Sequence, residues 1–112
     1  MIIDSANGLP YQEYRLDGVL HRLDGPAVLC TVGNYWYKFG SLHRDDGPAC
    51  EFVYGDKQWY QHGRLHREDG PAVEYADGAK AWYFEGSPYY VDSLEEFQEA
   101  VSVHKVRQVL ES

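Results

Sequence analysis

Residues 59–73 read Trp-Tyr-Gln-His-Gly-Arg-Leu-His-Arg-Glu-Asp-Gly-Pro-Ala-Val, and this stretch decides the fold because the chain repeats it. Residues 14–28, Tyr-Arg-Leu-Asp-Gly-Val-Leu-His-Arg-Leu-Asp-Gly-Pro-Ala-Val, align with it, as do residues 36–50, Trp-Tyr-Lys-Phe-Gly-Ser-Leu-His-Arg-Asp-Asp-Gly-Pro-Ala-Cys. Chance does not produce such near-identity three times, so the chain is a repeat protein. The shared core, G-x-L-H-R-x-D-G-P-A, recurs after 22 and then 23 residues and begins at Gly18, Gly40 and Gly63.

A fourth copy begins as Trp-Tyr-Phe-Glu-Gly at residues 82–86 and then loses the pattern, as terminal units of repeat arrays do. Each unit is expected to contain two short strands, with the first extended from Trp to His-Arg and reversed at Asp-Gly. The sequence therefore predicts a mainly β (α+β) fold, an antiparallel β-meander of tandem β-hairpin repeats of about 22 residues with six to eight strands. We expect a single domain over 1–112, with an N-terminal cap over 1–12 and the repeats over 13–90.

Alternation along the strands assigns side chains to the two faces of the sheet. One set is expected to be buried: Trp36, Leu42, Trp59, Leu65, Val73, Tyr75 and Trp82. The other set is expected on the opposite face: Tyr37, Phe39, His43, Tyr60, His62, His66 and Tyr83. A bulge at the glycine inside each long strand would switch the assignment beyond that glycine.

The end of the chain, from Asp92 onward, lacks Gly and Pro and has the pattern of a helix over 92–110. Ser93 and Glu96 fit a capping box, and a broad apolar face is formed by Leu94, Phe97, Val101, Val103, Val106 and Leu110. About 17 helical residues span about 25 Å, close to the width of five or six strands. We therefore expect the helix to cap the sheet or to cover most of one of its faces. The alternative is a helix that binds a partner.

The net charge of −8, from 18 acidic and 10 basic residues, disfavours direct binding to nucleic acid or to an anionic membrane. It suits a basic partner, such as the nucleic-acid groove of an enzyme, although acidity alone also keeps a protein with 10 Tyr in solution. No apolar run approaches the roughly 20 residues of a membrane span, and no secretory leader is recognisable. These features predict a cytoplasmic protein.

The chemistry-bearing residues argue against catalysis. The repeated histidines His21, His43 and His66 lie two strands apart, about 9.6 Å, which is too far to share one metal ion. The three Arg/Asp pairs (Arg22/Asp24, Arg44/Asp46, Arg67/Asp69) are expected to hydrogen-bond across their own turns, together with the histidines. Cys30 and Cys50 are expected about 12 Å apart as free, inward-facing thiols, because a disulfide requires less than about 7 Å. No catalytic motif occurs, so we predict no enzyme activity, no cofactor and no metal.

The repeated W-Y-x-x-G-x-L-H-R-x-D-G-P-A unit resembles the MORN-like repeats of bacterial and phage proteins, including a YwqK-type group described as antitoxin components. The resemblance covers residues 13–90. It implies a binding platform, and by its compact form a small phage or bacterial accessory protein. The His-Arg-x-Asp-Gly-Pro-Ala turn departs from the Gly-x-Gly of eukaryotic MORN repeats, so lipid binding is not implied.

Our leading hypothesis is a non-catalytic protein-interaction module, an inhibitor of the anti-defence, anti-CRISPR-like or antitoxin kind, that neutralises a basic or nucleic-acid-binding protein in the bacterial host. The alternatives are a structural, oligomeric or virion-associated scaffold and, less favoured, a protein that sequesters a nucleotide. Tyr, Phe and His supply contact area and acids supply charge. The predicted partner-binding residues are Tyr37, Phe39, Tyr60, His62, Tyr83, Asp45, Asp46, Asp56, Glu68, Asp69, Glu74 and Asp77.

Overall fold

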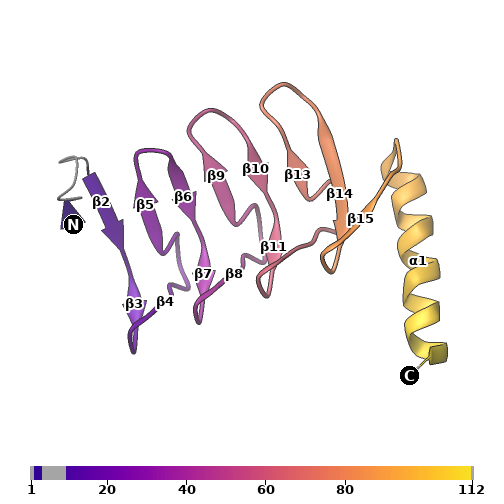
Figure 1. Ribbon diagram of the computed structural model, residues 1–112, viewed down its shortest axis with the longest axis horizontal. Coiled ribbons are helices and arrows are strands. Elements are labelled where there is room, and N and C mark those ends of the chain that lie inside the picture. The colour runs from indigo at the N-terminus through magenta and orange to yellow at the C-terminus, as the bar shows by residue number, and fades with distance from the viewer. Residues whose placement is uncertain (1, 4–9, 112) are drawn as a thin grey trace.

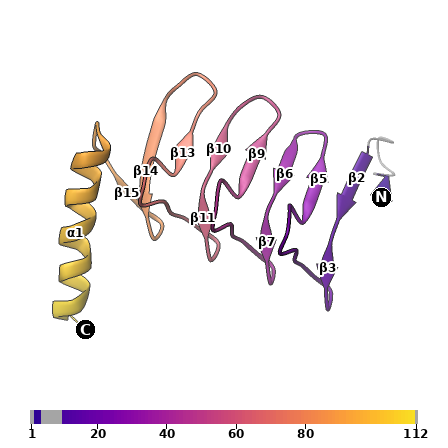
Figure 2. The ribbon, with the colours of Figure 1, turned by 180° about the vertical axis from the view of Figure 1, so that it is seen from behind.

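The repeats form one long antiparallel sheet, as the computed structural model shows for the residues that it describes, 2–3 and 10–111 (Figures 1 and 2). Hydrogen bonds join the strands in the order β1-β2-β5-β6-β9-β10-β13-β14-β15. These strands are β1 (Ile2–Ile3), β2 (Pro10–Glu13), β5 (Val28–Cys30), β6 (Gly33–Tyr35), β9 (Cys50–Phe52), β10 (Lys57–Gln58), β13 (Val73–Glu74), β14 (Lys80–Phe84) and β15 (Ser87–Tyr89). The predicted mainly β meander with one C-terminal helix is confirmed, and this sheet has nine strands instead of six to eight.

A second set of short hairpins hangs from the lower end of the sheet in Figure 1. They pair β3 (Arg15–Leu16) with β4 (Val19–Leu20), β7 (Tyr37–Lys38) with β8 (Ser41–Leu42), and β11 (Tyr60–Gln61) with β12 (Arg64–Leu65). Both residues of each connecting turn have positive φ, the signature of a type I′ turn. These turns are Asp17-Gly18, Phe39-Gly40 and His62-Gly63, and Glu85-Gly86 repeats the pattern between β14 and β15.

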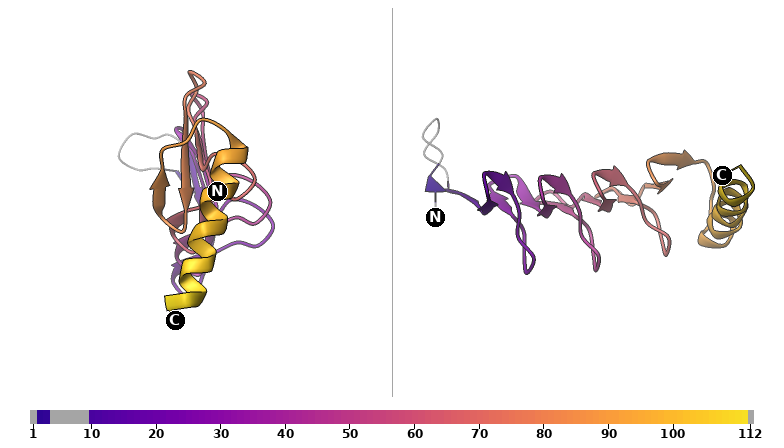
Figure 3. Two further views of the ribbon diagram at one scale, coloured as in Figure 1. Left: turned by 90° about the vertical axis from the view of Figure 1, so that its right-hand side faces the viewer. Right: turned by 90° about the horizontal axis from the view of Figure 1, so that it is seen from below.

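The predicted position of the chain reversal was therefore wrong. The strand that begins at Trp59 reverses at His62-Gly63, and not at Asp69-Gly70, whose glycine does not have a positive φ. After each hairpin, residues 21–27, 43–49 and 66–72 form a loop that projects to one side of the sheet (Figure 3). We call the side that carries these three loops the loop face and the opposite side the smooth face.

Register assigns side chains to the two faces. One row of paired residues consists of Asn34, Glu51, Lys57, Glu74 and Lys80, and the loop residue Arg67 contacts Glu74, so this row lies on the loop face. The alternate row consists of Tyr35, Cys50, Gln58, Val73 and Ala81 and lies on the smooth face.

The predicted division of faces was partly wrong. Trp36, Trp59 and Trp82 do share the loop face, but Val73 lies on the smooth face. Leu42 and Leu65 follow the reversed hairpin and pair with Tyr37 and Tyr60. Tyr75 is exposed beside the upper turn. His43, assigned to the opposite face, is buried in its loop.

The core is small because the sheet is a single layer. The molecule measures 50 × 35 × 22 Å, with the shortest dimension across the sheet. The repeated alanine of each loop is fully buried, and the residue that follows it is at most 8% exposed. These residues are Ala27, Val28, Ala49, Cys50, Ala72 and Val73. The carbonyl and amide groups of the alanines also join neighbouring strands, since Ala49 accepts from the amide of Trp36 and Ala72 from that of Trp59.

Helix α1 (Leu94–Glu111) stands at the C-terminal end of the array, beyond β15 (Figure 1). Ser93 caps its first turn by accepting a hydrogen bond from the amide of Glu96, as predicted. Phe97 and Val101 pack on Trp82 and Phe84. The helix thus caps the array, and the expectation that it covers a sheet face was wrong. Of the predicted apolar face, Val103, Val106 and Leu110 are exposed.

The predicted N-terminal cap over 1–12 lies largely outside the described residues. Where the chain is described, β1 pairs with β2 and extends the sheet by one strand. Within the described parts of the chain, no helix has the length and apolarity that crossing a bilayer requires.

Candidate protein-binding site

Each loop is held by an arginine that acts as an internal clamp. Its guanidinium stacks on the aromatic ring that opens the same unit, 3.8–4.0 Å from the ring centre. Its Nε donates to the aspartate of the same loop at 2.9–3.1 Å, and its Nη1 donates to the proline carbonyl at 3.1–3.2 Å. The three clamps are Tyr14-Arg22-Asp24-Pro26, Trp36-Arg44-Asp46-Pro48 and Trp59-Arg67-Asp69-Pro71. The predicted Arg–Asp hydrogen bonds across each turn are confirmed.

The glycine of each Asp-Gly pair leaves room for this clamp. A Cβ at Gly70 would lie 2.7 Å from Cζ of Arg67, and Gly25 and Gly47 show the same approach at 3.0 and 2.9 Å. A side chain at these glycines would displace the guanidinium, so glycine keeps the clamp in its place. The D-G-P segment is a packing motif and not the turn of a hairpin.

The repeated histidines join successive units, and two of them also contact an acid of their own loop, His43 with Asp45 and His66 with Glu68. Nδ1 of His43 accepts a hydrogen bond from the backbone amide of His62 at 3.0 Å. In the same way, Nδ1 of His21 accepts a hydrogen bond from the amide of Phe39 at 3.0 Å, and Nδ1 of His66 accepts one from the amide of Glu85 at 2.9 Å. Because the three acceptors face positive-φ turn residues, each histidine fixes the hairpin of the following unit. The predicted hydrogen bond of a histidine within its own turn is confirmed for His43, which contacts Asp45. The bond from each histidine to the next unit was not predicted.

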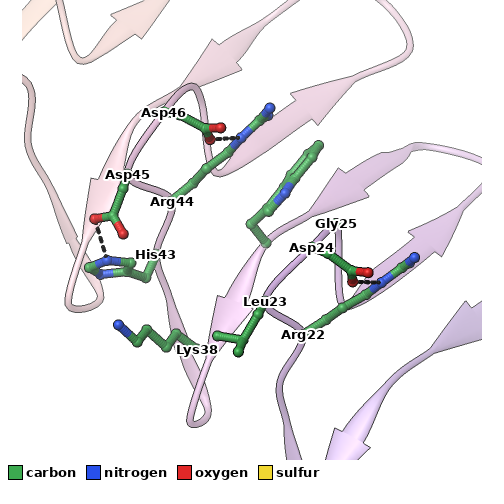
Figure 4. Close-up of a pocket in the computed structure, with 10 residues that line it drawn as sticks. Arg22, Leu23, Asp24, Gly25, Lys38, His43, Arg44, Asp45 and Asp46 are labelled. Carbon is green, nitrogen blue, oxygen red and sulfur yellow. Dashed lines mark hydrogen bonds and ion pairs between the residues drawn. The ribbon is translucent and has the colours of Figure 1, made fainter.

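Grooves with tryptophan floors separate neighbouring loops on the loop face. The first lies between loops 21–27 and 43–49 and is shown in Figure 4, where Lys38 lies between the two walls. Trp36 also lines this groove. The second lies between loops 43–49 and 66–72, with Trp59 and Gln61 at its floor. In both, the arginine of the second wall covers one side of the floor ring.

The helix occupies the place of a fourth loop. Phe97 packs against Trp82 in a tilted arrangement, with ring centres 5.2 Å apart, where Arg44 and Arg67 contact the two earlier tryptophans. Nζ of Lys105 contacts Glu68 of the third loop at 2.6 Å. The chain itself thereby occupies the space beside the third loop, whereas the two grooves between loops are open to solvent.

The carboxylates at the loop tips are highly exposed although each has a partner. The side chains of Asp24, Asp46 and Asp69 are 86–87% exposed, and each uses only Oδ1 towards its arginine. Asp45 contacts Nε2 of His43 at 2.9 Å, and this hydrogen bond lowers the pKa of the Asp45 carboxyl. The hydrogen bond from Lys105 likewise lowers the pKa of Glu68. We call this set the loop ridge: Asp24, Asp45, Asp46, Glu68 and Asp69.

The predicted partner-binding residues do not come together on one surface. The loop ridge contains four of them, Asp45, Asp46, Glu68 and Asp69. Glu74 lies in the loop-face row of the sheet and is paired with Arg67. Asp56 and Asp77 lie in the upper turns, where their carboxylates accept the amides of Ala76 and Ala79. The aromatic members are elsewhere: Tyr37, Tyr60 and Tyr83 are on the smooth face, and Phe39 and His62 are in the lower turns.

Sequence reasoning missed the groove floors, Trp36 and Trp59, because it placed them in a buried interior. It also missed Leu23, which is 79% exposed on the first loop. One signal was present: the arginine follows the aromatic residue by eight positions in all three units, a constant spacing that predicts a contact between them.

Neither a metal centre nor a relative helps to assign the site. In residues 11–111, no group of three or more His, Cys, Asp or Glu side chains is arranged to hold a metal ion. Compared with protein-family models, with curated proteins and with solved structures, the chain matches none of them.

Both thiols are free, as predicted, and they differ in burial. Cys50 is 2% exposed on the inner part of the sheet, and burial raises its pKa to about 12. We therefore expect the Cys30→Ser variant, which retains Cys50 alone, to resist a disulfide reagent at pH 8 while folded and to react fully in urea. Rapid reaction of the folded variant would contradict this burial. The Cys50→Ser variant is the control, since Cys30 is only half-buried.

Proposed function

We propose that this chain is a small, non-catalytic protein-interaction module, an inhibitor of the anti-defence or antitoxin kind, that binds a protein target through its loop ridge. The observation that carries the proposal is the presence of three near-identical loops, each clamped by an arginine and each presenting an exposed carboxylate. Binding residues are commonly held on loops that a rigid scaffold positions.

Preorganisation supports this proposal. Each loop is fixed by a cation–π contact, two hydrogen bonds from its arginine and a histidine link to the next unit. Loops that are already ordered lose little conformational entropy when they bind, and this increases affinity. Since two strands separate equivalent positions, neighbouring loops are about 9.6 Å apart along the sheet. A partner surface of several side chains in register would contact all three loops.

The charge of the loop ridge favours a basic partner. Its five carboxylates exceed the four cations that pair with them, Arg22, Arg44, Arg67 and Lys105. The chain as a whole has a net charge of −8. A partner rich in Lys and Arg, such as a nucleic-acid-processing protein, complements this surface, and binding of this type weakens with salt. The MORN-like character of the repeat is in keeping with a binding platform.

The test compares two double variants of the same chemistry in a pull-down from the native host, with mass spectrometry. Asp46→Asn with Asp69→Asn removes two of the five carboxylate charges of the loop ridge but keeps an oxygen for each arginine. Asp56→Asn with Asp77→Asn does the same at the upper turns and is the matched control. We expect a basic protein that wild type and control retain at low salt, that is lost at about 0.5 M salt, and that the ridge variant retains at least about 10-fold less.

Equal retention by the two double variants would exclude the loop ridge as the binding site. Recovery of the bait alone at low salt would contradict the inhibitor function itself. Thermal unfolding of both variants, measured in parallel, shows whether a loss of binding comes from a loss of folding.

A further inference from the structure

The smooth face is uncharged across the middle of the array. The charged residues of strands β5, β6, β9, β10, β13 and β14 are Glu51, Lys57, Glu74 and Lys80, and all four lie in the loop-face row. The smooth-face row that alternates with them contains no charge. At its N-terminal end, Glu13 faces the same side, and its carboxylate is paired with Arg15 at 2.8 Å.

Aromatic and apolar side chains fill this face. Tyr37, Tyr60 and Tyr83 follow the uncharged row at equivalent positions of three units, and the pKa values of Tyr37 and Tyr60 are raised chiefly by burial. Above them, Phe52 packs edge-on against Tyr35 and stacks on Tyr54, with ring centres 5.7 and 5.3 Å apart. Half-buried tyrosines on a flat sheet offer large contact area at low entropic cost.

None of the described elements covers this face. The three loops project from the other side of the sheet, as the view from below in Figure 3 shows, and helix α1 stands beyond its end (Figure 1). A sheet with one apolar face reaches full stability when a second layer packs on that face. The layer is absent from a single copy of the described chain.

We propose that a second copy of this chain supplies the missing layer, so that two molecules pack smooth face against smooth face about a two-fold axis. A two-fold axis places a patch against itself, which requires a self-complementary surface. The smooth face meets this condition because it brings no like charges together, whereas any contact through the loop ridges would oppose carboxylates in a chain of net charge −8.

The size of the face is sufficient for such a dimer. Seven strands, β2 to β14 in the order of the sheet, extend about 34 Å at about 4.8 Å each, and six residues along a strand extend about 20 Å. The footprint is thus roughly 700 Å² on each copy, or roughly 1,400 Å² in total, within the range of stable interfaces. Aligned sheets in a sandwich are about 10 Å apart.

The dimer does not depend on the proposed inhibitor function. Packing two smooth faces leaves the loop ridges on the two outer surfaces, where each remains free to bind. Its stability rests on apolar contact, so salt is not expected to dissociate it, in contrast to binding at the ridge. The two proposals can therefore be disproved independently. The mass of the isolated protein tests the dimer, and the pull-down tests the inhibitor function.

Sedimentation velocity of the purified full chain at about 1–100 µM tests the proposal, with two isosteric variants. Gln58→Glu places a carboxylate at the centre of the smooth face, and Asn34→Asp places one in the loop-face row. We expect wild type and Asn34→Asp to sediment at twice the 12.9 kDa of one chain, at low and at 0.5 M salt. Gln58→Glu should weaken the dimer at least 10-fold, and Tyr60→Glu should give monomer.

Circular dichroism identifies any variant that fails to fold. Gln58→Glu changes one amide to a carboxylate of the same shape, so it disturbs the fold less than Tyr60→Glu. A wild-type chain that is monomeric over the whole concentration range overturns the proposal. A dimer that Asn34→Asp weakens as much as Gln58→Glu also overturns it, because the interface would then not be the smooth face. An open-ended series of larger species does so too, since a two-fold contact closes at two copies.

Discussion

Replacing Phe97 with alanine is expected to lower the free energy of unfolding by about 3–5 kcal/mol, the range for a fully buried phenylalanine. Phe97 is 0% exposed, and its ring lies 5.2 Å from that of Trp82 and 5.6 Å from that of Tyr89. Its removal leaves a cavity at the only apolar cluster in which helix and sheet meet in the described part of the chain. Urea unfolding followed by tryptophan fluorescence measures the loss.

Val106→Ala is the matched control on the same helix. Val106 is exposed, so its truncation is expected to change stability by less than about 0.5 kcal/mol. Helix α1 is the closing unit of a repeat array, and such units protect the end of the array. If Phe97→Ala unfolds at the urea concentration of wild type, the helix does not stabilise the array and its docking on Trp82 is incorrect.

The repeat predicted the class of fold because tandem hairpin units of nearly constant spacing build an antiparallel sheet, although the number of strands is higher than predicted. It did not predict where the chain reverses, since two dipeptides per unit end in glycine. In the first unit both are Asp-Gly, at 17–18 and 24–25, and only the first has positive φ. The second aspartate instead accepts a hydrogen bond from Arg22, an interaction between side chains that turn preferences do not encode.

The sequence did not decide between a helix that caps the array and one that covers a face, for a related reason. A helix about 25 Å long fits the width of five or six strands, but it also fits the length of one hairpin unit at the end of the array. The deciding interaction is Phe97 on Trp82 in place of a clamping arginine. Sequence alignment of the units stops before this residue, so the equivalence of helix and loop is visible only in three dimensions.

The candidate site was predicted only in part. Four of its acids, Asp45, Asp46, Glu68 and Asp69, do lie together on the loop ridge because they occupy the same two positions of adjacent units. The aromatic residues were assigned to the same surface, although strand alternation and the hairpin turns place them on the smooth face and the lower edge. The misplaced turn therefore led the sequence analysis to combine residues of separate surfaces into one predicted site.

The difference between 22 and 23 residues in the repeat spacing has a structural cause at Gly33. In the first unit, Thr31 and Val32 alone connect β5 to β6, since Cys30 pairs with Gly33. The next unit has one residue more at this turn, where Phe52 donates to the carbonyl of Asp56. The shorter turn brings the backbone of Gly33 close to β9: a Cβ there would lie 2.5 Å from the carbonyl oxygen of Glu51 and 3.1 Å from Cα of Phe52.

Gly33→Ala is accordingly expected to destabilise the junction between the first and second units by about 1–3 kcal/mol or more, because backbone atoms cannot yield unless β6 moves away from β9. Ala79→Gly, at the equivalent position of the third unit, is the reciprocal control and should cost about 0.5–1 kcal/mol. Since units of a repeat array are stabilised mainly by their neighbours, amide hydrogen exchange should show protection lost over residues 10–42 and retained over 50–111. Uniform loss along the chain would mean that the array unfolds as one cooperative unit, and an unchanged variant would mean that the close approach at Gly33 is wrong.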